Sequence, residues 1–81
     1  MSDEDINTYL TRRPFEPFSI HVSAGNKYSI RHPDFVTVGP TRVDIGMPRR
    51  EGTRLVDRVF SIALAHIVRL EPLENQPSIM A

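Results

Sequence analysis

Apolar and polar side chains alternate over most of this chain, which predicts short β-strands. In residues 18–22 apolar side chains stand at every second position, and residues 27–31 resume the alternation. Between these segments, Gly25 and Asn26 tolerate the positive φ that a tight turn requires. The two segments therefore predict a β-hairpin.

Residues 2–12 show a different spacing, which predicts one amphipathic helix. Ser2 is suited to the N-cap position, and Asp5 three residues later completes a capping-box arrangement. Apolar side chains then fall at i, i+3 and i+4 and form one stripe: Ile6, Tyr9 and Leu10. Pro14 disfavours helical geometry at Arg13, so the helix should end before the proline.

After the hairpin, short apolar segments continue with turn residues between them, which is typical of a small bent sheet or barrel. His32-Pro33 is expected to form the bend that lets the sheet curl, because proline cannot donate to a strand ladder. Further strands are expected at residues 35–38, 42–45 and 55–64 and around Val68 and Leu70, with an exposed loop at 47–54 and a flexible tail at 73–81. Residues 1–72 therefore predict a single α+β, mainly β domain.

The composition is compatible with one small domain that has a real core. The chain has 81 residues, of which 40% are hydrophobic, and a domain of this size is only marginally stable on its own. Oligomerisation is therefore expected. The core residues predicted from the alternation are Leu10, Phe18, Ile20, Val22, Ile30, Val36, Val38, Val43, Ile45, Phe60, Ile62, Val68 and Leu70.

The charge balance and the cysteine content limit which cellular compartment and which binding partners we expect. Ten basic residues balance ten acidic ones, which argues against binding nucleic acid through net charge alone. The chain has no cysteine, no apolar run long enough to span a membrane and no signal peptide, so we expect a cytoplasmic protein without a membrane partner. Lys27 is the only lysine, so nine of the ten basic residues are arginine. This bias reflects either codon usage or a need for phosphate-binding groups.

No residue pattern predicts a catalytic site, a metal site or a cofactor. Three histidines are far apart and match no ligand spacing: His21, His32 and His66. Three aspartates stand in or beside expected turns, where they serve the backbone: Asp34, Asp44 and Asp57. So small a chain also has little room for a walled pocket. We therefore expect no enzymatic activity and no small-molecule substrate.

Two surface features are candidates for binding. The first is a basic loop, in which Arg49, Arg50 and Arg54, with Arg58 on the following strand and His66 further along, predict a site for RNA or another anion. The alternative interpretation is a solvated loop whose charge supports solubility. The second is the edge of the long strand 55–64, because short sheets must close or pair their edges. We expect self-association there through Val56, Phe60 and Ile62.

One run of residues resembles a family of small uncharacterised bacterial proteins. The pattern is RPFxPFxI in residues 13–20, followed by Gly25 and by His32-Pro33 at the bend. The resemblance covers most of the chain and implies a bacterial protein with an N-terminal helix. It brings no assigned function.

The layout is also similar to Sm-like proteins of the Hfq type, which have an N-terminal helix and five bent strands that close a small barrel. Residues 18–25 resemble their first strand with its glycine turn, and residues 62–68 resemble their late strand, turn and last strand. In these proteins the turn carries a Tyr-Lys-His motif; His66 matches it, whereas Leu64 and Ala65 replace the tyrosine and the lysine. The resemblance implies a five-stranded Sm-like or SH3-like barrel, a homo-oligomer and RNA as a partner.

Together these observations give two main functional hypotheses, and an enzyme with an undetected carboxylate pair near Asp34, Asp44 or Asp57 is a third and least favoured one. The leading one is a non-enzymatic binding or assembly module that self-associates through strand edges and whose further partner is not identified. The alternative is an Sm-like RNA-binding protein that uses the basic loop.

Overall fold

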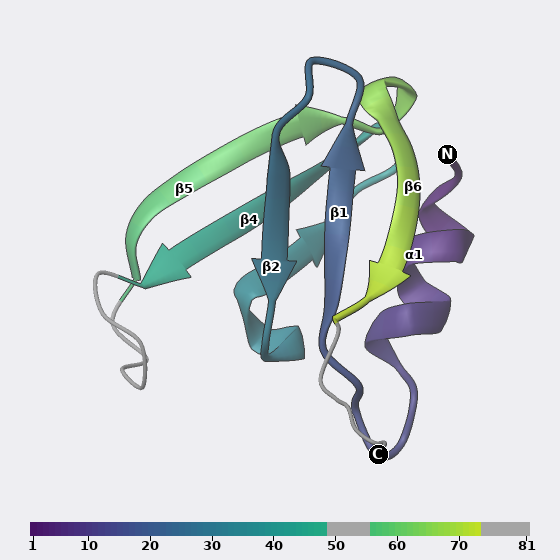
Figure 1. The fold of residues 1–81 in the computed structure, drawn as a ribbon, viewed down its shortest axis with the longest axis vertical. Coiled ribbons are helices and arrows are strands. Elements are labelled where there is room, and N and C mark those ends of the chain that lie inside the picture. Colours follow the sequence, from purple (N-terminus) through teal and green to yellow (C-terminus); the bar gives the residue numbers. More distant parts are fainter. Residues whose placement is uncertain (49–55, 74–81) are drawn as a thin grey trace, which may run out of the picture.

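The computed structural model describes residues 1–48 and 56–73, which form one helix and six strands (Figure 1). The predicted α+β, mainly β class is confirmed. The elements are α1 (Asp3–Leu10), β1 (Phe18–Val22), β2 (Lys27–Ile30), η1 (Pro33–Phe35), β3 (Val36–Val38), β4 (Arg42–Pro48), β5 (Val56–Ala63), η2 (Leu64–His66) and β6 (Ile67–Pro72). Most of the predicted loop and all but the first residue of the predicted tail lie outside the described residues.

The strands form two three-stranded antiparallel sheets. Sheet A has the order β2-β1-β6, and sheet B has the order β3-β4-β5. Sheet B passes behind sheet A, and its strands cross those of sheet A obliquely (Figure 1). Within the described ranges no ladder joins the two sheets into a closed barrel, so the predicted five-stranded barrel is not observed. The predicted bend at His32-Pro33 is a 3-10 turn that separates β2 from β3.

The N-terminal helix forms as its capping residues predict, although it is shorter than residues 2–12. Ser2 Oγ accepts a hydrogen bond from the Asp5 amide at 3.2 Å, and the Asp5 carboxylate accepts one from the Ser2 amide at 3.4 Å. The helix ends at Leu10 because Thr11 caps it, donating both its amide and its hydroxyl to Asn7 O. α1 lies beside β6 and places Ile6 and Leu10 in the core (Figure 1).

Among the described residues, ten buried apolar side chains make up the core between the two sheets and the helix. They are Ile6, Leu10, Phe18, Ile20, Ile30, Val36, Val43, Ile45, Leu64 and Ile67. Seven of these were predicted from alternation. Four further predicted residues are only partly buried and pack against the core: Val22, Val38, Ile62 and Leu70. Phe60 is half-buried and contacts Tyr28 instead.

The prediction that Val68 belongs to the core is wrong, because a β-bulge changes the alternation of β6. His21 pairs with Arg69, but Val22 pairs with Ile67, so Val68 is the extra residue. The side chain of Val68 is 55% exposed, whereas Ile67 is 4% exposed. Ile67 therefore takes the inward position that alternation assigned to Val68.

The prediction that an exposed loop begins at Met47 is also wrong, because β4 extends beyond this residue. β4 continues through Gly46 and Met47 to Pro48, and Gly46 pairs with Val59 in the ladder. A Cβ at Gly46 would lie 3.2 Å from both γ-methyl groups of Val56. Glycine at this position therefore allows β5 to approach β4 closely, and the strand continues beyond it.

The η2 turn ties three parts of the chain together at one end of the molecule. The Leu64 amide donates to Thr41 O at 2.9 Å, and the Ser23 amide donates to His66 O at 2.8 Å. The N-terminal amino group of Met1 donates to Leu64 O at 3.4 Å. These bonds hold the end of β5 against the end of β1, where the groove described below is formed.

Candidate functional site

β5 is an edge strand, and two of the exposed large hydrophobic side chains of the described residues lie on it. β5 pairs with β4 on one side and with no described strand on the other. Val59 is 64% exposed and Val56 is 47% exposed. Unpaired backbone donors and acceptors next to exposed valines are a template for pairing with another strand.

The three residues predicted as contacts on this edge differ in their exposure to solvent. Val56 is exposed, as a contact residue would be, whereas Phe60 and Ile62 are half-buried and turn inward toward Tyr28 and the core. Val59 was not predicted as a contact residue. The same alternation that places Phe60 inward places Val59 outward, so the pattern contained this information.

A bulge limits the part of the β5 edge that can pair regularly. Met47 pairs with Arg58, but Pro48 pairs with Val56, so Asp57 is the extra residue. The regular segment therefore runs from Arg58 to Ala63. Bulges twist an edge locally and so protect it from pairing along its whole length.

Only one arginine of the predicted basic site lies among the described residues. Arg58 Cζ is 5.6 Å from the centroid of the Phe60 ring on the same strand, in a cation–π contact. Arg49, Arg50 and Arg54 lie outside the described residues, so the basic loop stays a prediction.

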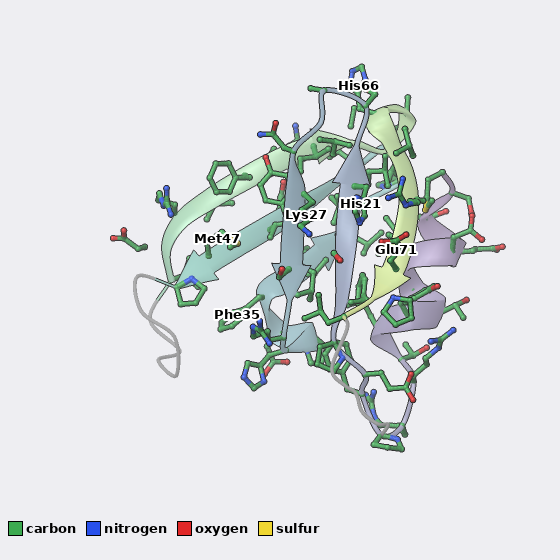
Figure 2. The ribbon with its side chains drawn as sticks, in the orientation of Figure 1. His21, Lys27, Phe35, Met47, His66 and Glu71 are labelled. Carbon is green, nitrogen blue, oxygen red and sulfur yellow. The ribbon has the colours of Figure 1, made fainter. Side chains whose placement is uncertain are left out.

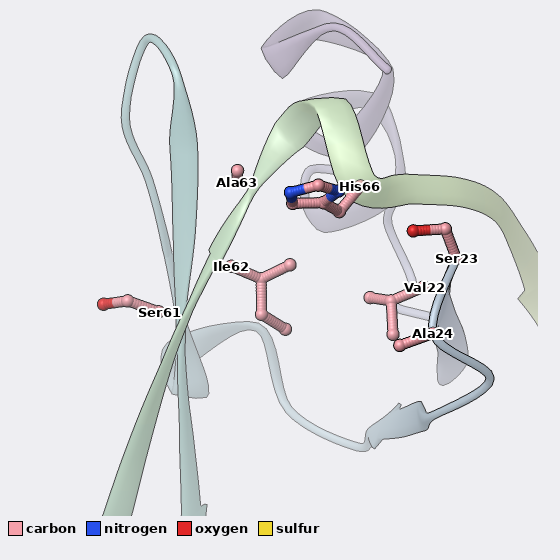
Figure 3. A pocket seen from close by; sticks show the side chains of 7 residues that line it. All are labelled: Val22, Ser23, Ala24, Ser61, Ile62, Ala63 and His66. Carbon is pink, nitrogen blue, oxygen red and sulfur yellow. The ribbon is translucent and has the colours of Figure 1, made fainter.

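His66 lines a groove of about 380 Å³ where the ends of β1 and β5 meet η2 (Figure 3). Val22 and Ile62 face each other across the groove, and the His66 ring lies along one side of it (Figure 3). The hydroxyl of Ser23 is at the rim, while the Ser61 side chain points away. Ser61 donates its hydroxyl hydrogen to the Asp44 carboxylate on β4. The groove thus has apolar walls and a polar rim.

A charged cluster lies on the face of sheet A that is turned away from the core. His21 Nε2 is 3.1 Å from Glu71 Oε1, and the guanidinium Nε of Arg69 donates to Glu71 Oε2 at 2.8 Å. The hydrogen bond from Arg69 lowers the pKa of the Glu71 carboxyl below its ordinary value, helped by the charge of Arg69 and by His21, although desolvation acts in the opposite direction.

Neither Arg69 nor Glu71 was selected from the sequence. Their meeting with His21 depends on the pairing of β1 with β6, which joins segments far apart in the chain. A local pattern of side chains does not reveal which distant strand will be the neighbour, so no sequence feature pointed to this cluster.

The three histidines do not converge. His21 is on β1, His66 is on η2, and His32 packs edge-on against Phe35 with ring centroids 5.6 Å apart. Within residues 1–48 and 56–73, no three histidine or acidic side chains lie close enough together to hold a metal ion. In the same ranges no helix has the length and hydropathy required to cross a membrane.

No family model matches this chain, and no curated protein or solved structure matches it either. The resemblances to the small bacterial family and to Sm-like proteins therefore stay predictions from the sequence.

Proposed function

We propose that this protein is a non-enzymatic assembly module in which copies associate through the outer edge of β5. The observation that carries the proposal is the exposure of Val59 and Val56 beside the unpaired backbone of β5. Pairing a second strand along the regular segment Arg58 to Ala63 would satisfy backbone groups and bury Val59. The small size of the chain adds to the argument, because an interface would supply stability that one small core provides only in part.

Two arrangements of copies are compatible with this edge. β5 of one copy pairing with β5 of another makes a two-fold dimer, since the same surface is used on both sides. β5 pairing with a different edge, such as β6 with its exposed Val68, makes a head-to-tail contact that closes into a ring or extends as a filament. Both place Val59 in the interface, and only the second places Val68 there.

We also propose that the two sheets are halves of an opened SH3-like barrel in a cytoplasmic protein. The path of the chain supports the barrel: it leaves sheet A through η1 and returns to it through η2, as a strand bent between two sheets would require. The cytoplasmic location is supported by the absence of cysteine from the sequence.

The test of self-association is the oligomeric state of the wild-type chain and of Val59→Lys. Light scattering coupled to gel filtration at micromolar concentration should show an oligomer for the wild type and a monomer for Val59→Lys, because a buried lysine is costly in an edge pairing. Thr37→Lys is the matched control, since Thr37 is exposed on β3, the opposite edge of the same sheet. A wild type that is strictly monomeric would contradict the proposal.

Val68→Lys separates the two arrangements of copies. If it leaves the oligomer intact while Val59→Lys dissociates it, the contact is β5 with β5 or with another edge than β6. If both variants dissociate the oligomer, the contact is β5 with β6.

RNA binding is the alternative function, favoured by the position of His66 on an open groove with a polar rim. Fluorescence anisotropy with a short RNA oligomer should then show binding at low salt that weakens steeply as salt is added. His66→Ala should weaken this binding, while His32→Ala should not, because His32 packs against Phe35 and does not line the groove. Absence of binding at low salt would remove this alternative.

A further inference from the structure

Three basic side chains form a row across the outward face of sheet A. His21 on β1 is directly opposite Lys27 on β2 and directly opposite Arg69 on β6. Residues that are opposite each other in an antiparallel sheet point to the same face, with their Cβ atoms about 4.5–5.5 Å apart. Figure 2 shows Lys27 and His21 on neighbouring strands of this face, with Glu71 beside them on β6. We call Lys27, His21 and Arg69 the basic row.

Among residues 1–48 and 56–73, the anion that contacts this row is the carboxylate of Glu71. Its two oxygens contact two members of the row, His21 Nε2 at 3.1 Å and Arg69 Nε at 2.8 Å. The contact with His21 is incomplete, because Nε2 is buried yet makes no hydrogen bond of good geometry with any described group. In the described ranges Lys27 makes no ion pair. The Glu71 carboxylate therefore contacts two members of the row, and the charge of the third, Lys27, has no ion pair in the described ranges.

We infer that the basic row is a binding site for a small oxyanion and that Glu71 occupies it as an intramolecular competitor. The Glu71 carboxylate shows that an oxyanion fits between His21 and Arg69. Glu71 is 48% exposed and stands next to Pro72, the last residue of an edge strand, so its side chain can leave without disturbing the core. A tetrahedral dianion in its place has four acceptor oxygens and a second negative charge, which the charge of Lys27, opposite His21 on the neighbouring strand, would balance.

Sulfate is the probe that tests the site, because its charge stays at two across the working pH range. The full chain is titrated with sodium sulfate against sodium chloride at constant ionic strength, and binding is followed through the imidazole resonances of His21. Glu71→Gln removes the competing charge and keeps the shape of the side chain. It should bind sulfate about fivefold more tightly than the wild type, since exposed charge pairs have effects of this order.

Three further variants make the result specific. Lys27→Gln added to Glu71→Gln should cancel the gain, because it removes the cation that Glu71 leaves unpaired. Glu71→Ser also removes the carboxylate, by shortening the side chain, and should give the same gain in sulfate affinity. Glu16→Gln removes an exposed carboxylate that pairs with Arg12 instead, and should leave the wild-type affinity unchanged.

Three results would overturn the inference. The first is equal sulfate affinity for Glu71→Gln and the wild type. The second is a gain that survives the loss of Lys27, which would mean general screening of charge. The third is a response of the His66 or His32 resonances without one at His21.

Discussion

Tyr28 on β2 and Phe60 on β5 pack their rings together across the two sheets, with ring centroids 5.3 Å apart and ring planes inclined at 43°. β2 is the edge of sheet A and β5 is the edge of sheet B, and no described ladder connects them. The aromatic contact therefore links side chains of the two sheets on this side of the molecule, where no described backbone ladder does so. It also explains why Phe60 turns inward although it lies on an exposed edge strand.

The Tyr28–Phe60 contact should be measurable as a coupling energy. Phe60→Ala is expected to lower the free energy of unfolding by about 2 kcal/mol, less than for a fully buried phenylalanine. In a double-mutant cycle with Tyr28→Ala the coupling should be about 1 kcal/mol. Urea denaturation of the four proteins measures it. A cycle of Phe60 with Tyr9, which packs on Phe18 instead, is the control and should show additivity.

The bulge in β6 makes opposite predictions for two neighbouring residues. Ile67→Ala should destabilise the protein by about 2–4 kcal/mol, because Ile67 is buried in the core. Val68→Ala should change the free energy of unfolding by less than about 0.5 kcal/mol, because Val68 is exposed. Chemical denaturation of both variants compares them. Equal destabilisation, or a larger effect at Val68, would mean that β6 has regular alternation without a bulge.

The ion pairs of Glu71 predict a dependence of stability on pH. Its pKa is lowered from the ordinary value of 4.5, mainly by the hydrogen bond from Arg69, so the folded state binds this proton less readily than the unfolded state. The stabilisation is therefore present above about pH 5 and is lost as the pH falls through the lowered pKa. Glu71→Gln should be less stable than the wild type at neutral pH, and the difference should disappear as the pH falls below the lowered pKa of Glu71.

Denaturation midpoints at several pH values measure this difference. Glu16→Gln serves as the control, because its only described ion pair is a 3.7 Å contact with Arg12 at the surface. A constant difference between wild type and Glu71→Gln across the pH range would contradict the assignment.

The capping box should make Ser2 the most sensitive exposed residue of the helix. Ser2→Ala removes the acceptor for the Asp5 amide and should cost about 1 kcal/mol of stability. Ser2→Asp retains an oxygen acceptor at the N-cap and should restore most of the loss. Thermal unfolding monitored by circular dichroism tests both. If Ser2→Asp were as unstable as Ser2→Ala, the role of the cap would have to be rejected.

Local patterns were sufficient to predict the hairpin and the helix. The β1–β2 hairpin forms with Ile20 opposite Tyr28, and Gly25 has the positive φ, 101°, that its turn requires. The capping box of Ser2 and Asp5 is formed as well. In each case the interacting residues are close in sequence, so propensity and spacing determine the outcome.

Features that depend on distant neighbours could not be predicted in this way. Leu64 is buried in a single 3-10 turn, which is too short to produce a periodic pattern. Val68 leaves the core because of a bulge that arises only when β6 pairs with β1. The same distinction applies to the candidate sites. The β5 edge could be predicted from local alternation, whereas the contact of His21 with Glu71 could be predicted only if the pairing of β1 with β6 were known.

The order of the strands has a consequence for how the chain assembles in time. Sheet B is built from consecutive strands joined by local connections, whereas sheet A needs β6 to reach β1, with Phe18 paired to Pro72 across more than fifty positions. Closing so long a loop is entropically unfavourable and slows the formation of such contacts. The β1–β2 hairpin and sheet B should therefore acquire hydrogen-exchange protection first, and β6 last. Until β6 arrives, β1 itself is an exposed edge.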